Sequence, residues 1–208
     1  MSNPRYVYRY LSSAEHADQM LEGKVWISTF EHIRTVDASR GDPHEGTLAF
    51  GERPISALSA DERAGVEAQA LAMGRPNIPG VEPRVRLLAK VRDAYMLCTS
   101  LKKHDKQLMR MFGEHCVRIE DPPKVLEAIA GALNLKAPVD RRICAPMTYR
   151  GRAIPEQTIA WQAPYLANIP SLSNEREFRF CWVPAQTTAS IESVLVDLPE
   201  LAPKMRRM

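Results

Sequence analysis

Residues 175–183, EREFRFCWV, carry the clearest strand pattern in the chain. Aromatic side chains recur at every second position: Phe178, Phe180 and Trp182. Charged side chains alternate with them: Glu175, Glu177 and Arg179. Because neighbouring side chains of a strand point to opposite faces, this pattern predicts one charged face and one aromatic face that must be buried. The fold therefore has to contain a sheet with at least one side packed on a core.

Other segments show short apolar runs or the same alternation, and we predict strands there: 5–11, 24–29, 94–101, 115–119, 141–149 and 191–196. Helical patterns with capping residues or prolines at their starts predict three helices: 13–22, 104–112 and 123–134. Strands and helices mixed in this way indicate the α+β class, with a largely antiparallel β-sheet core and flanking helices.

A long stretch of the chain interrupts this pattern. Residues 31–60 resemble an exposed, turn-rich loop region, residues 60–73 predict a helix, and residues 74–84 hold too many prolines and glycines for a regular element. We therefore expect residues 1–208 to form a single domain with an insertion or lid at 31–90.

The charge balance excludes few partners. The 28 basic and 25 acidic residues give a net charge of +3, which neither requires nor forbids binding to nucleic acid. The basic run at 204–207, KMRR, indicates a solvated end or a phosphate contact. His44, beside Asp42 and Glu45, is interpreted as part of a turn, so no metal site is predicted.

The four cysteines and the apolar runs bear on location. No two cysteines form a C-x-x-C pair, which favours buried thiols in a reducing compartment and a cytoplasmic protein. No apolar stretch approaches about 18 residues, so we expect no membrane contact. The oligomeric state stays open.

Glu175 and Glu177 are the main candidates for chemistry. Two carboxylates on one strand face suit the stabilisation of positive charge and the orientation of hydroxyl groups. The alternative is an ordinary charged strand face on which Glu177 pairs with Arg179. Arg9, on the face of the first strand opposite the tyrosines, either takes part in binding or pairs with one of the glutamates across the sheet.

Two predicted strands end in hydroxyl residues, Ser28-Thr29 and Thr99-Ser100. Such residues often make only a local hydrogen bond at a strand end or helix start. An arginine on the first strand, a hydroxyl at the end of a middle strand and E-x-E on a late strand nevertheless resemble the arginine–serine–glutamate class of ADP-ribosyltransferases.

The resemblance implies an ADP-ribosyltransferase-like fold that binds NAD as substrate. It implies that Arg9 binds an NAD phosphate and that a serine holds the loop around the nicotinamide ribose. It also implies that Glu177 contacts the ribose and favours an oxocarbenium-like transition state, with Glu175 orienting or deprotonating the acceptor. Thr99-Ser100 is favoured over Ser28 as the site of that serine, because a strand–helix–strand passage begins there, as it usually does in the class.

A second resemblance covers more of the chain. It is to a bacterial family of unknown function with an aromatic–basic–aromatic first strand and an E-x-E-x-R strand. The matching segments are Tyr8-Arg9-Tyr10, Val25-Trp26-Ile27-Ser28, Gly41-Asp42-Pro43-His44-Glu45, Cys98-Thr99-Ser100, Met111-Phe112-Gly113 and Glu175-Arg176-Glu177-Phe178-Arg179. Gly41 replaces an asparagine of that family, and Arg110 stands where a tryptophan is common.

Two functions are consistent with these residues. The first is an NAD-dependent ADP-ribosyltransferase, a glycosyltransferase-type enzyme acting on a macromolecular acceptor, either protein or nucleic acid. The second is a catalytically inactive binding module of the same fold, for example in phage–host or toxin-type conflict.

Overall fold

The computed structural model describes residues 4–36, 47–61, 63–64, 84–149, 153–154, 165, 167–168, 170–185 and 191–208. Its helices are α1 (Ala14–Leu21), α2 (Phe30–Val36), α4 (Lys106–Phe112) and α5 (Pro122–Asn134), with short 3-10 helices η1 (Ile55–Ala57), η3 (Pro170–Glu175) and η4 (Pro199–Lys204). His44 and its neighbours Asp42 and Glu45, and residues 65–73 of a predicted helix, lie outside the described residues.

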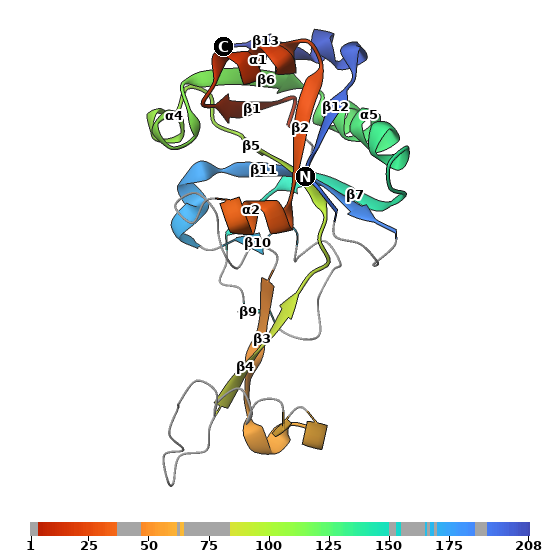
Figure 1. The fold of residues 1–208 in the computed structure, drawn as a ribbon. Coiled ribbons are helices and arrows are strands. Elements are labelled where there is room, and N and C mark those ends of the chain that lie inside the picture. The colour runs from red at the N-terminus through yellow and green to blue at the C-terminus, as the bar shows by residue number, and fades with distance from the viewer. Residues whose placement is uncertain are drawn as a thin grey trace.

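Eight strands form the main sheet: β1 (Tyr6–Leu11), β2 (Lys24–Thr29), β5 (Tyr95–Ser100), β6 (His115–Glu120), β7 (Val139–Pro146), β11 (Glu177–Pro184), β12 (Val194–Asp197) and β13 (Met205–Arg207). Every pairing in this sheet is antiparallel. Figure 1 shows the sheet with its helices. The predicted α+β class with a largely antiparallel sheet is confirmed, and each of its predicted strands and helices overlaps an observed element.

The sheet divides at β5, which is paired with three strands. On one side β11 runs along the whole of β5, from Trp182 opposite Tyr95 to Glu177 opposite Ser100. On the other side β5 pairs first with β2, at Tyr95 and Met96, and then with β1, at Ser100. Strands β2 and β12 form one branch, and β1, β6 and β13 form the other. At its Ser100 end, β5 therefore lies between β1 and β11, so three strands that are distant in the sequence meet there.

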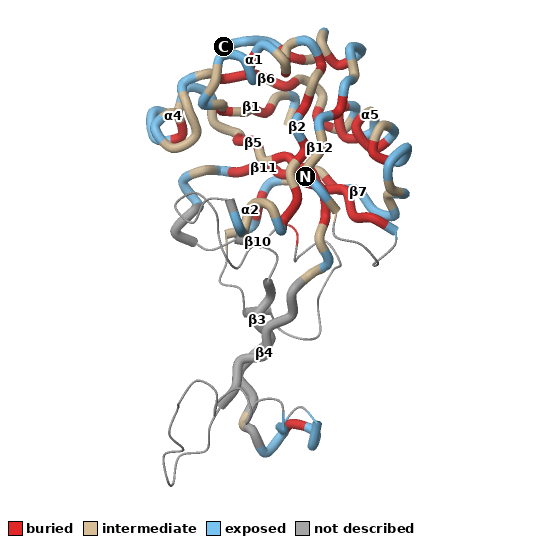
Figure 2. The backbone as a smooth tube through the Cα atoms, in the orientation of Figure 1, coloured by how far each residue is buried: buried red, intermediate tan, exposed pale blue. Residues whose placement is uncertain are grey.

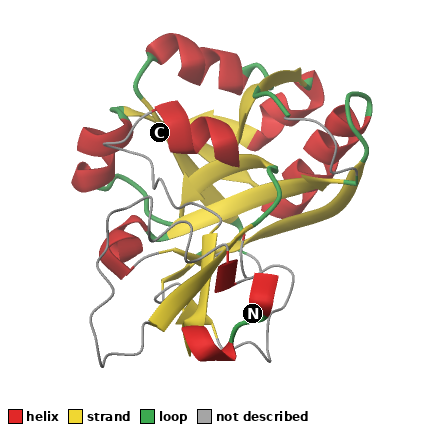
Figure 3. Cartoon of the chain, turned by 60° about the horizontal axis from the view of Figure 1, so that its bottom comes forward, coloured by secondary structure: helices red, strands yellow, loops and turns green. Residues whose placement is uncertain are grey.

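Helices cover both faces of the main sheet (Figure 3). Helices α1 and α5 contribute Ala17, Met20, Val125 and Ile129 to the largest core cluster, which also contains the aromatic face of β11. On the other face, α2 contributes Phe30 to a second cluster and α4 contributes Leu108 to a third. Figure 2 shows the buried residues concentrated in these central strands and the helix faces that pack on them.

Strand β11 is buried on both faces. All eight of its residues are buried, and Phe178, Phe180 and Trp182 have no exposed surface. The predicted aromatic core face is confirmed. The charged face is not solvated, because Phe30 of α2 and Tyr165 pack against it.

The range predicted as an insertion has two different parts. Helix α2 packs on the main sheet through Phe30, whereas β3 (Thr47–Pro54) and β4 (Arg84–Lys90) form a separate sheet with β9 (Ala153–Ile154). The two long strands of this second sheet extend away from the main body (Figure 1). The prediction of a loop region over 31–60 was wrong for α2 and β3. In β3 the backbone hydrogen bonds are satisfied by pairing with β4, which local turn composition does not reveal.

A further small sheet pairs β8 (Thr148–Tyr149) with β10 (Ala167–Asn168).

Of the helices in the described part of the chain, none combines the length and the apolar character that crossing a membrane requires.

Candidate functional site

The three strands that carry the candidate residues lie side by side. Ser100 on β5 is directly opposite Tyr8 on β1 and directly opposite Glu177 on β11. Residues that oppose each other in antiparallel strands point to the same face of the sheet. Tyr8, Ser100 and Glu177 therefore form a row across the sheet, on the face that carries α2 and α4.

Glu177 is held in a buried ion pair. Its carboxylate accepts hydrogen bonds from Arg179, with Nε to Oε1 at 2.8 Å and Nη2 to Oε2 at 3.0 Å. The side chains are only 2% and 7% exposed for Arg179 and Glu177 respectively. Arg179 also donates to the carbonyl of Tyr165 at 3.2 Å and lies 5.7 Å from the centre of the Phe30 ring. This is the pairing that the sequence offered as an alternative, but it is buried rather than solvated.

Tyr149 and Cys98 complete the surroundings of Glu177. The Tyr149 hydroxyl accepts the backbone N–H of Glu177 at 2.6 Å and retains its own proton for donation. Burial is the main cause that raises the pKa of Tyr149, so its side chain stays a neutral phenol. Burial also raises the pKa of Cys98 well above its usual value, and the nearby charge of Glu177 adds to that shift. The site therefore combines one fixed carboxylate with two neutral groups that donate protons.

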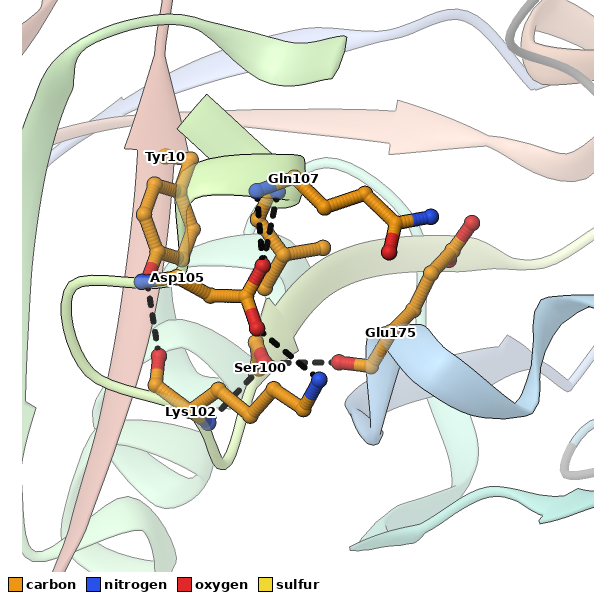
Figure 4. Close-up of polar contacts among 7 residues, drawn as sticks. Tyr10, Ser100, Lys102, Asp105, Gln107 and Glu175 are labelled. Carbon is orange, nitrogen blue, oxygen red and sulfur yellow. Dashed lines mark hydrogen bonds and ion pairs between the residues drawn. The ribbon is translucent and has the colours of Figure 1, made fainter. Parts of the chain in front are cut away.

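Glu175 does not share the strand with Glu177. It is the last residue of η3, and Arg176 after it has a positive φ of 43°, which turns the chain before β11 begins at Glu177. The prediction that both glutamates lie on one strand face was therefore wrong. The carbonyl of Glu175 accepts a hydrogen bond from the Ser100 hydroxyl at 2.7 Å (Figure 4). Glu175 thus lies next to the row through its backbone contact with Ser100.

Ser100 anchors a second polar network, drawn in Figure 4. Its hydroxyl oxygen accepts the backbone N–H of Lys102 at 3.0 Å, and the Lys102 ammonium donates to Asp105 at 2.8 Å. The Tyr10 hydroxyl links the same loop by donating to the carbonyl of Lys102 and accepting the N–H of Asp105. The hydrogen bond from Lys102 is the main cause that lowers the pKa of Asp105, which caps α4 as a carboxylate. The loop between β5 and α4 is therefore tied to β1 and η3.

The other candidates have distinct positions. Arg9 donates a hydrogen bond from its guanidinium to the carbonyl of Cys98, beside the point where β5 passes from β2 to β1. Arg9 makes no ion pair with Glu175 or Glu177 in the described part of the chain. The Thr99 hydroxyl donates to the carbonyl of Phe178 at 2.6 Å. Ser28 lies opposite Met96, about 13 Å along β5 from Ser100.

The structure thus brings Ser100, rather than Ser28, next to Glu177. Sequence reasoning missed Tyr149 and the proximity of Cys98. Tyr149 lies 28 residues before Glu177 in the chain, on β8, which directly follows β7. The pairing of β7 with β11, with Pro146 opposite Phe178, brings this part of the chain to Glu177. The sequence did offer one signal for Cys98, because it directly precedes Thr99-Ser100 in a predicted strand.

No group of three or more histidine, cysteine, aspartate or glutamate side chains within the described ranges is placed to hold a metal ion. Comparisons of the chain with family models, curated proteins and solved structures give no match.

The four cysteines are free thiols, and at least three of them should react slowly. Burial raises the pKa of Cys116 and of Cys144 from 9.0 to about 11, and it also raises that of Cys98 well above its usual value. A rise of two units lowers the thiolate fraction at pH 8 about 100-fold, and the stronger nucleophilicity of a thiolate of higher pKa offsets about tenfold of that loss. The folded protein should therefore react at least about tenfold more slowly with a disulfide reagent than the unfolded chain.

The rates should be measured with Ellman's reagent, with modified peptides identified by mass spectrometry. Because the thiolate is the reactive form, each of the three rates should increase about tenfold per pH unit below pH 10. Reaction of Cys98 in the folded protein at the rate of a free thiol would contradict its placement beside Glu177.

Proposed function

We propose that the chain is an NAD-dependent ADP-ribosyltransferase that acts on a macromolecular acceptor, protein or nucleic acid. The observation that supports the proposal most strongly is the register of three strands. Ser100 lies opposite Glu177, and Tyr8, the neighbour of Arg9, lies opposite Ser100. Ser100 and Glu177, which resemble two of the three residues of the arginine–serine–glutamate class, are distant in sequence and adjacent in the fold. Arg9 alternates with Tyr8 along β1, and its described contact with β5 is the hydrogen bond to the carbonyl of Cys98.

In the proposed reaction, the bond between the nicotinamide nitrogen and the ribose carbon breaks, and its electron pair leaves with nicotinamide. Positive charge then develops on the ribose, and a carboxylate fixed nearby lowers the energy of that state. Glu177 is the proposed carboxylate. Arg179 and Tyr149 hold its side chain and backbone in one position, so little reorganisation is needed when charge develops.

An oxygen or nitrogen nucleophile of the acceptor then forms a bond to the same ribose carbon and loses its proton. Glu175 is proposed to orient this nucleophile or take the proton. Arg9 is proposed to bind an NAD phosphate, and Thr99 and Ser100 to position the loop that borders the nicotinamide ribose. The hydrogen bonds from Ser100 to Glu175 and from Ser100 to Lys102 support that last role.

A catalytically inactive module of the same fold is the second candidate. The observation that favours it is the buried pair itself, because the positive charge of Arg179 opposes the field that Glu177 would exert on a ligand. The Thr99 and Ser100 hydroxyls also donate their hydrogen bonds to backbone carbonyls, those of Phe178 and Glu175. In this reading the row stabilises the meeting point of the strands, and the protein binds a macromolecule without transferring ADP-ribose.

Titration calorimetry with NAD tests the proposal. Arg9→Ala should weaken NAD binding by about 10- to 150-fold, because a hydrogen bond to a charged group contributes about 1.5–3 kcal/mol. Arg110→Ala is the matched control, since Arg110 is exposed on α4 and its removal changes the net charge equally. Absence of NAD binding at millimolar concentration would exclude the enzyme. NAD binding without nicotinamide release in cell extract would favour the inactive module.

A further inference from the structure

The row of residues at the candidate site continues across two more strands. Tyr8 on β1 is opposite Arg118 on β6, and Arg118 is opposite Arg206 on β13. All of these pairs are in direct register, so their side chains share one face of the sheet. From Glu177 to Arg118 there are three strand-to-strand steps, which amount to about 14 Å. The row therefore runs from a carboxylate at the candidate site to two arginines near the edge of the sheet.

Arg118 has a guanidinium group without an acceptor. Its Nε is buried and has no hydrogen-bond partner, and no other bond or ion pair of Arg118 to an acceptor occurs in the described part of the chain. The guanidinium lies 4.5 Å from the centre of the Tyr6 ring, and that of Arg5 lies 5.0 Å from the same ring. A buried donor without an acceptor costs free energy, and an anionic ligand would satisfy it.

The neighbouring cations are different, because acidic groups already neutralise them. Arg207, next to Arg206 but on the opposite face of β13, donates to Asp18 on α1. Lys204 pairs with Asp121, and Arg5 pairs with Glu120 at 3.5 Å. Arg206 is exposed, and within the described ranges it has no ion pair. Of these five cations on β6, β13 and η4 or directly before β1, Arg118 and Arg206 are thus the two without an acidic partner in the described part of the chain.

We propose that Tyr6, Tyr8, Arg118 and Arg206 bind a single-stranded polynucleotide. The two guanidinium groups suit phosphate oxygens. The partly exposed Tyr8 ring, and the Tyr6 ring with the guanidinium groups of Arg5 and Arg118 that lie over it, form a planar surface beside them that suits contact with bases. An acidic peptide would use the arginines but not the rings. The row leads from the two arginines to Ser100 and Glu177, so a polynucleotide bound along it reaches the candidate site. Its role as the acceptor for ADP-ribose rests on the proposed function.

Fluorescence anisotropy with labelled single-stranded DNA and RNA of about 12 nucleotides tests the binding directly. Arg206→Gln and Arg118→Gln should each weaken binding about tenfold and reduce the slope of log K against log salt by about one between about 50 and 200 mM salt. Arg207→Gln is the matched control. It removes the same charge from the adjacent residue on the other face and should change binding less than about twofold. Circular dichroism checks the folding of each variant, and Arg206, being exposed, provides a variant that should fold normally.

Three results would overturn the proposal. Equal losses for Arg206→Gln and Arg207→Gln would mean that only diffuse charge acts. Equal affinity for a polyglutamate peptide of similar length would mean that the surface recognises acidic protein. Displacement of the oligonucleotide by millimolar NAD would mean that the arginines bind the pyrophosphate. The anisotropy titration with oligonucleotide needs neither NAD nor turnover, and the calorimetric titration with NAD needs no oligonucleotide. Failure of this proposal and failure of the proposed enzyme are therefore separate results.

Discussion

Glu177→Gln and Arg179→Met should each lower the free energy of unfolding by about 3–5 kcal/mol, because each leaves a buried charge without its partner. The two side chains are almost entirely excluded from solvent and make two hydrogen bonds with each other. The double variant Glu177→Gln/Arg179→Met buries no charge, so it should be more stable than either single variant. Urea unfolding followed by circular dichroism measures all three.

Glu127 and Arg142 provide the matched control for this cycle. They form the same kind of pair at 2.7 Å, but their side chains are 56% and 43% exposed. Glu127→Gln and Arg142→Met should each cost less than about 1 kcal/mol. A loss below about 1 kcal/mol for Glu177→Gln, equal to that at the exposed pair, would mean that Glu177 and Arg179 are not buried together.

The double variant should also lose about 100- to 1000-fold in the rate of nicotinamide release, since it lacks one preorganised charge at the developing positive ribose. The single variant Glu177→Gln is less suitable for this test, because loss of rate and loss of stability occur together in it. The double variant should retain the fold, so its rate reports on the loss of the Glu177–Arg179 pair rather than on unfolding.

Glu127→Gln/Arg142→Met again serves as control and should release nicotinamide at the wild-type rate. Calorimetry should show that the Glu177→Gln/Arg179→Met protein still binds NAD, because Arg9 and Ser100 are unchanged in it. An unchanged rate in that protein would remove Glu177 from the proposed mechanism and leave any activity to other residues.

Local patterns predicted most of the main sheet, because alternation along a strand records which side chains face the core. The aromatic face of β11 and the pairs of apolar residues in β2 and β6 are of this kind. Strand β13 was not predicted. Its three residues, Met205–Arg207, are mostly charged, and their pairing with β6 depends on contacts distant in sequence.

The candidate site was harder to predict, because its geometry depends on tertiary structure. The spacing of Glu175 and Glu177 indicated a shared face, but the positive φ of Arg176 separates them into a 3-10 helix and a strand. No local pattern indicated that Phe30 and Tyr165 cover the charged face of β11. The division of the sheet at β5 brings Arg9 to the carbonyl of Cys98, and no local pattern encodes such a division.

The release of nicotinamide from NAD by the wild-type protein tests the proposed activity most directly. The protein should be incubated with NAD and with cell extract, which supplies protein and nucleic-acid acceptors, and nicotinamide should be quantified by chromatography. We predict release that depends on the extract and is lost in the Glu177→Gln/Arg179→Met protein. No nicotinamide above the level of that variant, from a folded wild-type protein, would contradict the enzyme and leave the inactive module.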